Sequence, residues 1–149
     1  MPPLVIHLLG QPRFTLGGES YKFAGRPKVL ALLAYLVLRR GSAASREKVA
    51  FTLWEDDAEE DARANFRRHL HLLQQALPAA PPDKPWIVAD GETVGWNPAA
   101  DARIDVVEFE RLASAKATRA AAIEWYGGDL LETAYDEWIF PERDRLRNR

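Results

Sequence analysis

The chain has 149 residues, of which 47% are hydrophobic and 10% aromatic, and its formal net charge is −2. This length and apolar content exclude a disordered chain and leave room for one ordinary domain, or for one small domain and part of another. The sequence contains no cysteine, which excludes disulfides and thiolate metal sites and favours a cytoplasmic location. No N-terminal signal is visible, and the longest apolar run, Val29–Leu38, is too short to span a bilayer.

The charge changes sign along the chain. Residues 1–54 hold eight basic and two acidic side chains, residues 55–61 hold six acids and no base, and residues 62–77 hold three arginines and no acid. The remainder holds nine basic and fourteen acidic side chains. Because a nucleic acid responds to the field of the local surface rather than to the net charge, this distribution is compatible with DNA binding.

Short strands are predicted at the start of the chain, at Leu4–Leu9, Arg13–Leu16 and Ser20–Phe23. The segments between them, residues 10–12 and 17–18, contain the glycines and the proline that tight turns require. The pattern indicates a small antiparallel sheet ahead of the helices.

A helix is predicted over Arg26–Arg40, with Pro27 near its first position and Gly41 just after its last. Apolar side chains recur at helical spacing and predict a face packed in the core. They are Val29, Leu32, Leu33, Leu36 and Val37, together with Leu30 and Tyr35 at the edges of the face. Arg39 and Arg40 lie at the end where positive charge stabilises the helix dipole.

Ser45 is predicted to cap a second helix that runs to about Trp54. Arg46 and Lys48 lie in its first turn, beside backbone amides that have no partner within the helix. Amides and cations together suit an anion, so this turn is a candidate phosphate clamp. Capping and solubility explain the same residues, and the sequence leaves both interpretations open.

Six of the seven residues in Glu55–Asp61 are acidic, and a loop is predicted here between the second and third helices. Seven residues exceed the tight turn of a simple helix-turn-helix motif. The last acids precede a helix, where negative charge stabilises the helix dipole. Because six acids are more than a cap needs, contact with another protein is a second interpretation.

The third predicted helix, Ala62–Leu77, divides its side chains between an apolar stripe and a basic, polar face. The stripe consists of Phe66, Leu70, Leu73 and Leu77. The opposite face consists of Arg67, Arg68, His71 and Gln75, with Arg63 and Asn65 in the first turn and Gln74 at the flank. These donors suit phosphate oxygens and base edges, and a helix of this width fits the major groove. A solvated face on an ordinary core helix is the alternative.

Prolines in residues 78–85 end this helix, and Trp86–Ala89 and Thr93–Trp96 are predicted to form a hairpin about Asp90-Gly91. The predicted elements follow the order of a winged helix: strands, two helices, a basic helix and a hairpin. The hairpin takes the place of the wing.

From Asp101 the pattern changes to helical segments. Apolar residues in Val106–Leu112 mark one helix, Ala115–Tyr126 a second, and Trp138–Leu146 the beginning of a third, with a break at Gly127-Gly128. Short consecutive helices predict an incomplete all-α, TPR-like helical-repeat domain, and we expect the chain to be part of a longer parent.

Four segments resemble the OmpR-type winged-helix DNA-binding domain in the version found in SARP-type transcriptional activators. They are LLGQPRFTLGG, RPKVLALLAYLVLRRG, SREKVAFTLW and ARANFRRHLHLLQQAL, all within residues 4–97. Residues from about 101 resemble the start of the bacterial transcriptional activator domain, in DVVEFERL, WYGGDLL, DEW and ERDRL. The expected fold is therefore α+β, with a winged helix-turn-helix domain at residues 1–100 and the N-terminal part of the helical-repeat domain at residues 101–149.

The resemblance implies a bacterial transcription regulator that binds directly repeated promoter sites in double-stranded DNA, usually as a pair of copies, and recruits RNA polymerase holoenzyme. It places the third helix in the major groove, with Arg67 and Arg68 as candidates for base contacts. The other candidate DNA-binding residues are Ser45, Arg46, Arg63, Asn65, His71, Gln74, Gln75 and Thr93. The residues implied to contact the polymerase are Glu55, Asp56, Asp57, Glu59 and Glu60.

The sequence departs from the family pattern at two places. Leu72 stands where many relatives have a cationic residue that faces DNA. The wing tip, Asp90–Thr93, holds two acids and no base, which leaves Thr93 as its phosphate donor.

Catalysis is not expected, because no acid–base or nucleophile constellation is present. His69 and His71 are two residues apart on a helix, point in different directions and cannot share a metal. We expect no cofactor, small-molecule substrate or membrane partner. The alternative function is a protein-interaction module that does not bind DNA. This alternative is favoured by the acidic loop, the acidic wing and the net negative charge. The arginines of residues 62–77 argue against it. The salt dependence of binding distinguishes the two functions.

Overall fold

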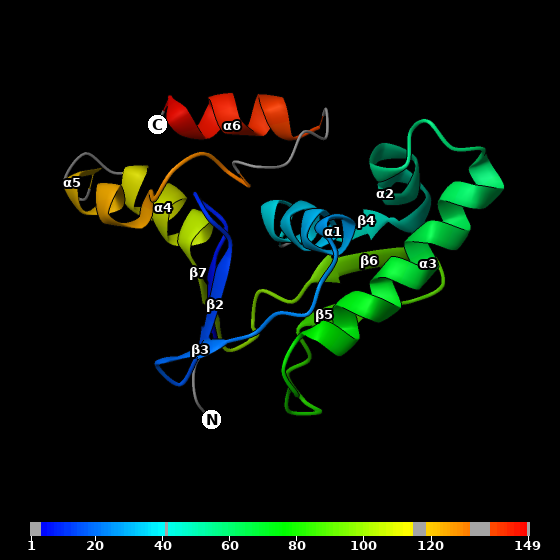
Figure 1. Cartoon of the computed structure of the whole chain (residues 1–149), viewed down its shortest axis with the longest axis horizontal. Coiled ribbons are helices and arrows are strands. Elements are labelled where there is room, and N and C mark those ends of the chain that lie inside the picture. Colours follow the sequence, from blue (N-terminus) through cyan, green and yellow to red (C-terminus); the bar gives the residue numbers. More distant parts are fainter. Residues whose placement is uncertain (1–3, 41, 115–118, 132–137, 149) are drawn as a thin grey trace. The chain divides into compact units, whose positions relative to one another are not determined.

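A computed structural model describes residues 4–40, 42–114, 119–131 and 138–148, and it contains two compact units (Figure 1). The central unit spans Phe23–Ala100, and the terminal unit combines Met1–Lys22 with Asp101–Arg149. Each unit contains helices and strands, in agreement with the predicted α+β class. The N-terminal strands group by their contacts with the C-terminal helices. The functional division into a DNA-binding domain up to residue 100 and a helical-repeat domain after it stays a prediction.

The central unit is built from helices and an antiparallel sheet. Its helices are α1 (Pro27–Leu38), α2 (Arg46–Leu53) and α3 (Glu59–Ala76). Its strands are β4 (Ala44–Ser45), β5 (Ile87–Ala89) and β6 (Thr93–Trp96), in the order β4-β6-β5. Helix α3 packs on α1 and α2, and the β5–β6 hairpin is the predicted wing. This is the arrangement of a winged helix.

The predicted apolar face of α1 is confirmed. The residues of this face are buried: Val29, Leu32, Leu33, Leu36 and Val37, together with Tyr35. Pro27 is the first residue of the helix, as its fixed φ angle and missing amide hydrogen predict. The helix ends at Leu38, so Arg39 and Arg40 follow its last turn, and their amides donate to carbonyls of that turn. The predicted terminal glycine, Gly41, lies outside the described residues.

The predicted boundary between the acidic loop and the third helix was wrong. Helix α3 begins at Glu59, three residues before the predicted start at Ala62, and only residues 54–58 connect it to α2. Glu59, Glu60 and Asp61 form its first turn. Acids are favourable in the first turn because they face the positive end of the helix dipole, so a run of acids at this position extends the helix.

The terminal unit contains the predicted N-terminal sheet and one strand that the sequence did not reveal. The sheet has the order β3-β2-β1-β7. Its strands are β1 (Leu4–His7), β2 (Arg13–Leu16), β3 (Glu19–Tyr21) and β7 (Ala102–Ile104). Strand β7 pairs in parallel with β1, in the register Leu4↔Ala102 to Ile6↔Ile104. Three residues are too few for β7 to show a periodicity in the sequence.

The helices of the terminal unit follow the predicted segments with changed limits. They are α4 (Asp105–Ala113), α5 (Arg119–Ala122), the 3₁₀ helix η2 (Ile123–Trp125) and α6 (Ile139–Arg147). The helix predicted over Ala115–Tyr126 is therefore shorter where it is described and ends in 3₁₀ geometry. Residues 115–118, and the first two residues of the DEW segment, lie outside the described residues.

Asp105, at the start of α4, joins this helix to the turn after β1. Its carboxylate accepts hydrogen bonds from the backbone amides of Leu8 (2.9 and 3.0 Å), Leu9 (2.9 Å) and Val106 (2.7 Å). The side chain is 1% exposed, and His7 Nδ1 lies 3.9 Å from its Oδ2. Burial raises the pKa of Asp105 to about 6, against the opposing effect of the three amides.

Replacement of this carboxylate should destabilise the terminal unit. Asp105→Ala leaves three backbone amides without an acceptor, and each buried, unpaired amide costs about 1–3 kcal/mol. Urea unfolding measures the loss, with Asp101→Ala, an exposed carboxylate nearby in sequence, as the control. Equal stability of the two variants would contradict the structural role of Asp105.

The pH dependence of Asp105 gives a second test. The folded protein holds the Asp105 proton more tightly than the unfolded chain, since the folded pKa of about 6 lies above the ordinary value of 3.8. The stabilisation from this group is therefore complete below about pH 4 and is lost as the pH rises through 6. The chemical shift of the Asp105 carboxyl carbon, followed by NMR, should titrate with a midpoint near 6. A midpoint near the ordinary value of 3.8 would show that the amides cancel the effect of burial on the pKa of Asp105.

Candidate nucleic-acid interface

Helix α3 presents the predicted polar face to solvent. Phe66, Leu70, Leu73 and Leu77, the predicted apolar stripe, are between 0% and 5% exposed. The predicted outward residues Arg67, Arg68, His71, Gln74 and Gln75 are all exposed. Arg63 and Asn65, in the part of the helix nearer α2, are half-buried. The helical spacing therefore identified both faces correctly.

Arg67 is the arginine of α3 with the freest guanidinium. Within the described residues, its side chain makes no hydrogen bond or ion pair. It lines a pocket of about 320 Å³ together with Arg46, Arg63, Phe66 and Gly91 of the wing tip. The other lining residues are Glu47 and Ala50. Three arginines and one glutamate thus line a pocket to which α2, α3 and the wing tip contribute.

Arg68 is held by a neighbour on the same helix. Its Nη2 donates to Asn65 Oδ1 at 2.7 Å, and Asn65 Nδ2 donates in turn to Asp57 Oδ2 at 2.9 Å. Asn65 is a predicted DNA-binding residue, and in the structure its amide links an arginine of α3 to the acidic turn before the helix.

Arg63 links α3 to α2. Its Nη2 lies 3.1 Å from Glu47 Oε1 and 3.8 Å from Glu59 Oε2, and its guanidinium lies 5.2 Å from the centre of the Phe51 ring. Both acids are exposed, so these ion pairs are weak. They orient Arg63 along the helix surface, at the pocket that it lines together with Arg67.

Arg46 joins the beginning of α2 to the wing. Its guanidinium donates to the carbonyl oxygen of Asp90 at 3.0 Å and lies 5.1 Å from the centre of the Phe66 ring. Its backbone amide donates to the carbonyl of Glu92 at 2.9 Å. Arg46 therefore has a structural role in addition to its predicted role as a phosphate ligand.

The predicted cap of α2 is confirmed, because Ser45 Oγ accepts a hydrogen bond from the amide of Lys48 at 3.3 Å. At the wing tip, Asp90 Oδ1 accepts from the amides of Glu92 (2.8 Å) and Thr93 (2.7 Å), and these bonds hold the pKa of Asp90 below its ordinary value. The hydroxyl of Thr93, the predicted phosphate donor of the wing, donates to Asp90 Oδ2 at 3.2 Å.

The two histidines of α3 occupy different environments. His69 is 6% exposed, its Nδ1 lies 2.7 Å from the carbonyl oxygen of Asn65, and its ring packs against Trp54 at 4.9 Å. Burial lowers the pKa of His69. His71 is exposed. The described residues contain no group of three side chains that could hold a metal ion.

The residues predicted to contact the polymerase are all exposed. Glu55, Asp56 and Asp57 lie in the connection before α3, and Glu59 and Glu60 lie in its first turn. The sequence did not reveal that Asp57 bonds to Asn65 or that Glu47 bonds to Arg63. The members of these pairs are 8 and 16 residues apart in the sequence, and a helix boundary lies between them. The sequence therefore shows no periodic pattern that connects the two residues of either pair.

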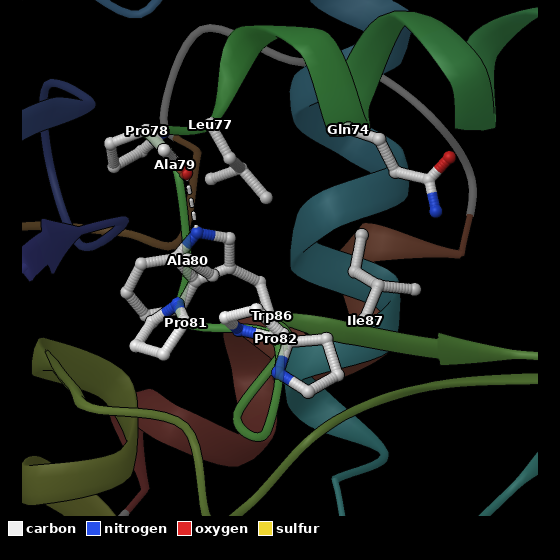
Figure 2. Close-up of a pocket in the computed structure, with 10 residues that line it drawn as sticks. Gln74, Leu77, Pro78, Ala79, Ala80, Pro81, Pro82, Trp86 and Ile87 are labelled. Carbon is white, nitrogen blue, oxygen red and sulfur yellow. Dashed lines mark hydrogen bonds between the residues drawn. The ribbon is translucent and has the colours of Figure 1, made fainter.

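A second pocket, of about 290 Å³, lies at the other end of α3 (Figure 2). Leu77, Trp86, Ile87 and the prolines of residues 78–85 line it, and Gln74 is its amide-bearing lining residue. Trp86 Nε1 donates to the carbonyl of Pro78 at 2.7 Å, which ties the proline-rich segment to the wing. Among the described residues, none that line this pocket carries a charge. Its chemistry differs from that of the arginine-lined pocket at the wing tip.

Comparison with known proteins identifies a relative and a similar fold, although no protein-family model matches the chain. Over 132 residues, 88% of this chain, the sequence is 30% identical to the regulatory protein AfsR of Streptomyces coelicolor, and the match covers 13% of that protein. The solved structure of Mycobacterium tuberculosis EmbR in complex with a low-affinity phosphopeptide matches with a TM-score of 0.74 and 22% identity. That match covers 99% of this chain and 42% of the EmbR chain.

The structural match supports the predicted α+β class, in which a winged helix is combined with further helices. The sequence match is to a regulatory protein, in agreement with the kind of protein that the sequence motifs predict, and the assignment to the SARP type stays a proposal. The chain spans about an eighth of the length of AfsR and less than half of the EmbR chain. Within the described residues, no helix has the length and apolar character needed to cross a membrane.

Arg46→Ala should loosen the wing. The substitution removes the hydrogen bond to Asp90 and the contact with Phe66, and a hydrogen bond of this kind contributes about 0.5–1.5 kcal/mol. Hydrogen exchange at the amide of Thr93 should become faster by the factor to which this loss of free energy corresponds. Lys48→Ala removes a cation from the same turn of α2 without touching the wing, so exchange should be unchanged in this control. Equal exchange in both variants would contradict the anchoring role of Arg46.

Proposed function

We propose that this chain is a sequence-specific, DNA-binding transcription regulator in which α3 enters the major groove. The observation that carries the proposal is the outward face of α3, where the guanidinium of Arg67 makes no hydrogen bond or ion pair within the described residues and lines a pocket with Arg46 and Arg63. Phosphate and the acceptor edge of guanine are the ligands that such a group of arginines suits. At the adjacent N-terminus of α2 the amides of Arg46 and Lys48 already donate to Glu92 and Ser45, so Arg46 adds its guanidinium there rather than its amide.

The finer parts of the proposal follow from the SARP-type assignment. The chain binds directly repeated promoter sites as a pair of copies, activates transcription in the cytoplasm, and contacts RNA polymerase holoenzyme through its acidic segment. The exposure of Glu55, Asp56, Asp57, Glu59 and Glu60 supports a protein contact at that position. We propose no catalytic activity and no cofactor.

In this mechanism Arg67 and Arg68 contact bases, and Arg46, Ser45, His71 and Gln74 contact phosphates. Phosphate contacts position the protein on the duplex, whereas base contacts provide the sequence specificity. The wing contributes less than in relatives, because its acids lie at the tip and its threonine hydroxyl is bonded to Asp90.

The test is selection from a random-sequence duplex library, followed by affinity measurements at about 50 and 150 mM salt. Recovery of a repeated motif, with affinity that falls steeply as salt rises, supports the proposal. A protein-docking surface would give weak salt dependence and no motif. This second function has specific support in the exposed acids at the beginning of α3 and at the wing tip.

Substitutions should separate base contacts from phosphate contacts. Arg67→Ala and Arg68→Ala should each relax specificity at one or two base positions, by about 1–3 kcal/mol of discrimination. Arg46→Ala should instead weaken all sequences alike and reduce the salt slope by about 0.9 for one lost phosphate contact. Arg111→Ala, an exposed arginine of the terminal unit, is the charge-matched control and should change neither quantity. Equal losses across all sequences for Arg46, Arg67 and Arg68 would refute the assignment of the base contacts.

A further inference from the structure

Arg68 is connected to the acidic turn before α3 through one side chain, that of Asn65. Arg68 Nη2 donates to Asn65 Oδ1 at 2.7 Å, and Asn65 Nδ2 donates to Asp57 Oδ2 at 2.9 Å. The Asn65 amide therefore has a guanidinium at its oxygen and a carboxylate at its nitrogen. No other arginine of α3 is bonded to an asparagine within the described residues.

The two charged partners fix the orientation of the Asn65 amide. An amide nitrogen only donates and its oxygen accepts, whereas a carboxylate only accepts and a guanidinium only donates. Rotation of the amide by half a turn would set two acceptors against each other at Asp57 and two donors against each other at Arg68. Asp57 therefore determines the direction of the Asn65 oxygen that Arg68 uses.

Asn65 and Asp57 are both bonded through their backbones to the two residues of one aromatic contact. The carbonyl oxygen of Asn65 lies 2.7 Å from Nδ1 of the buried His69, whose ring packs against Trp54 at 4.9 Å. The amide of Asp57 donates to the carbonyl of Trp54 at 3.1 Å. The turn that carries Asp57 and the helix that carries Asn65 are thus joined at a packed site.

We propose that Asp57 is a positioning residue for DNA recognition: through Asn65 it holds Arg68 in the conformation that contacts a base. The inference rests on the proposed function and adds a role for a residue that the family resemblance assigns only to polymerase contact. The effect arises because an arginine loses side-chain freedom on binding, and an arginine that is already held loses less. The expected gain is roughly two- to tenfold in affinity for the preferred base.

The experiment compares two duplexes, the selected site and the same site altered at the base where Arg68→Ala relaxes specificity. In Asp57→Ala the ratio of the two affinities should fall by roughly two- to tenfold. Asp56→Ala is the matched control, because it removes the same charge from the same turn, and the Asp56 side chain makes no hydrogen bond within the described residues. Its ratio should equal that of the parent protein. Asp57→Asn keeps an acceptor for Asn65 and should recover part of the ratio.

The double variant Asp57→Ala with Arg68→Ala should discriminate no worse than Arg68→Ala alone, since Asp57 acts only through Arg68. Equal ratios for Asp57→Ala and Asp56→Ala, or additive losses in the double variant, would overturn the positioning role while leaving base contact by Arg68 intact. If Arg68→Ala relaxes no position, the base contact itself is wrong and the positioning role falls with it. Circular dichroism of each variant confirms that α3 remains folded.

Discussion

The surface that α3 presents depends on the burial of one side of the helix, the stripe that contains Phe66, Leu70 and Leu73. Phe66 is 2% exposed, and α3 packs on α1 and α2. With 3.6 residues per turn, the burial of Phe66 leaves Arg67 and Arg68 at the surface. The guanidinium of Arg46, which holds the wing, also lies over the Phe66 ring. The arginine that joins the beginning of α2 to the wing tip therefore also contacts a buried aromatic side chain of α3.

The acids at the beginning of α3 divide its cations into two kinds. Arg63 is paired with Glu47 and Glu59, and Arg68 is tied through Asn65 to the acidic turn, whereas the side chain of Arg67 has no such bond among the described residues. Exposed ion pairs contribute only about 0–1 kcal/mol each. These contacts therefore orient the arginines more than they stabilise the fold, and an acidic segment next to a basic face is consistent with DNA recognition.

The terminal unit depends in a similar way on one buried side chain, the carboxylate of Asp105. Asp105 accepts hydrogen bonds from amides that lie 96 and 97 residues earlier, and the parallel pairing of β7 with β1 lies next to it. Burial raises the pKa of Asp105 to about 6, so part of its contribution varies within an accessible pH range. This contact explains why the N-terminal strands group with the C-terminal helices.

The sequence by itself determined the helices, the wing and the outward face of α3, because each depends on local spacing. The buried stripe of α3, the cap at Ser45 and the turn at Asp90 follow rules that act over a few residues. Only the tertiary structure decided which arginines of α3 are bonded to acids or to Asn65 and which are not, among the described residues. Strands β4 and β7, the bonds of Asp57 and Arg46, and the contacts of Asp105 join residues far apart in sequence. A strand of two or three residues is too short to show a periodic pattern in the sequence. A bond that forms only when separate elements pack together leaves no local sequence pattern from which it could be predicted.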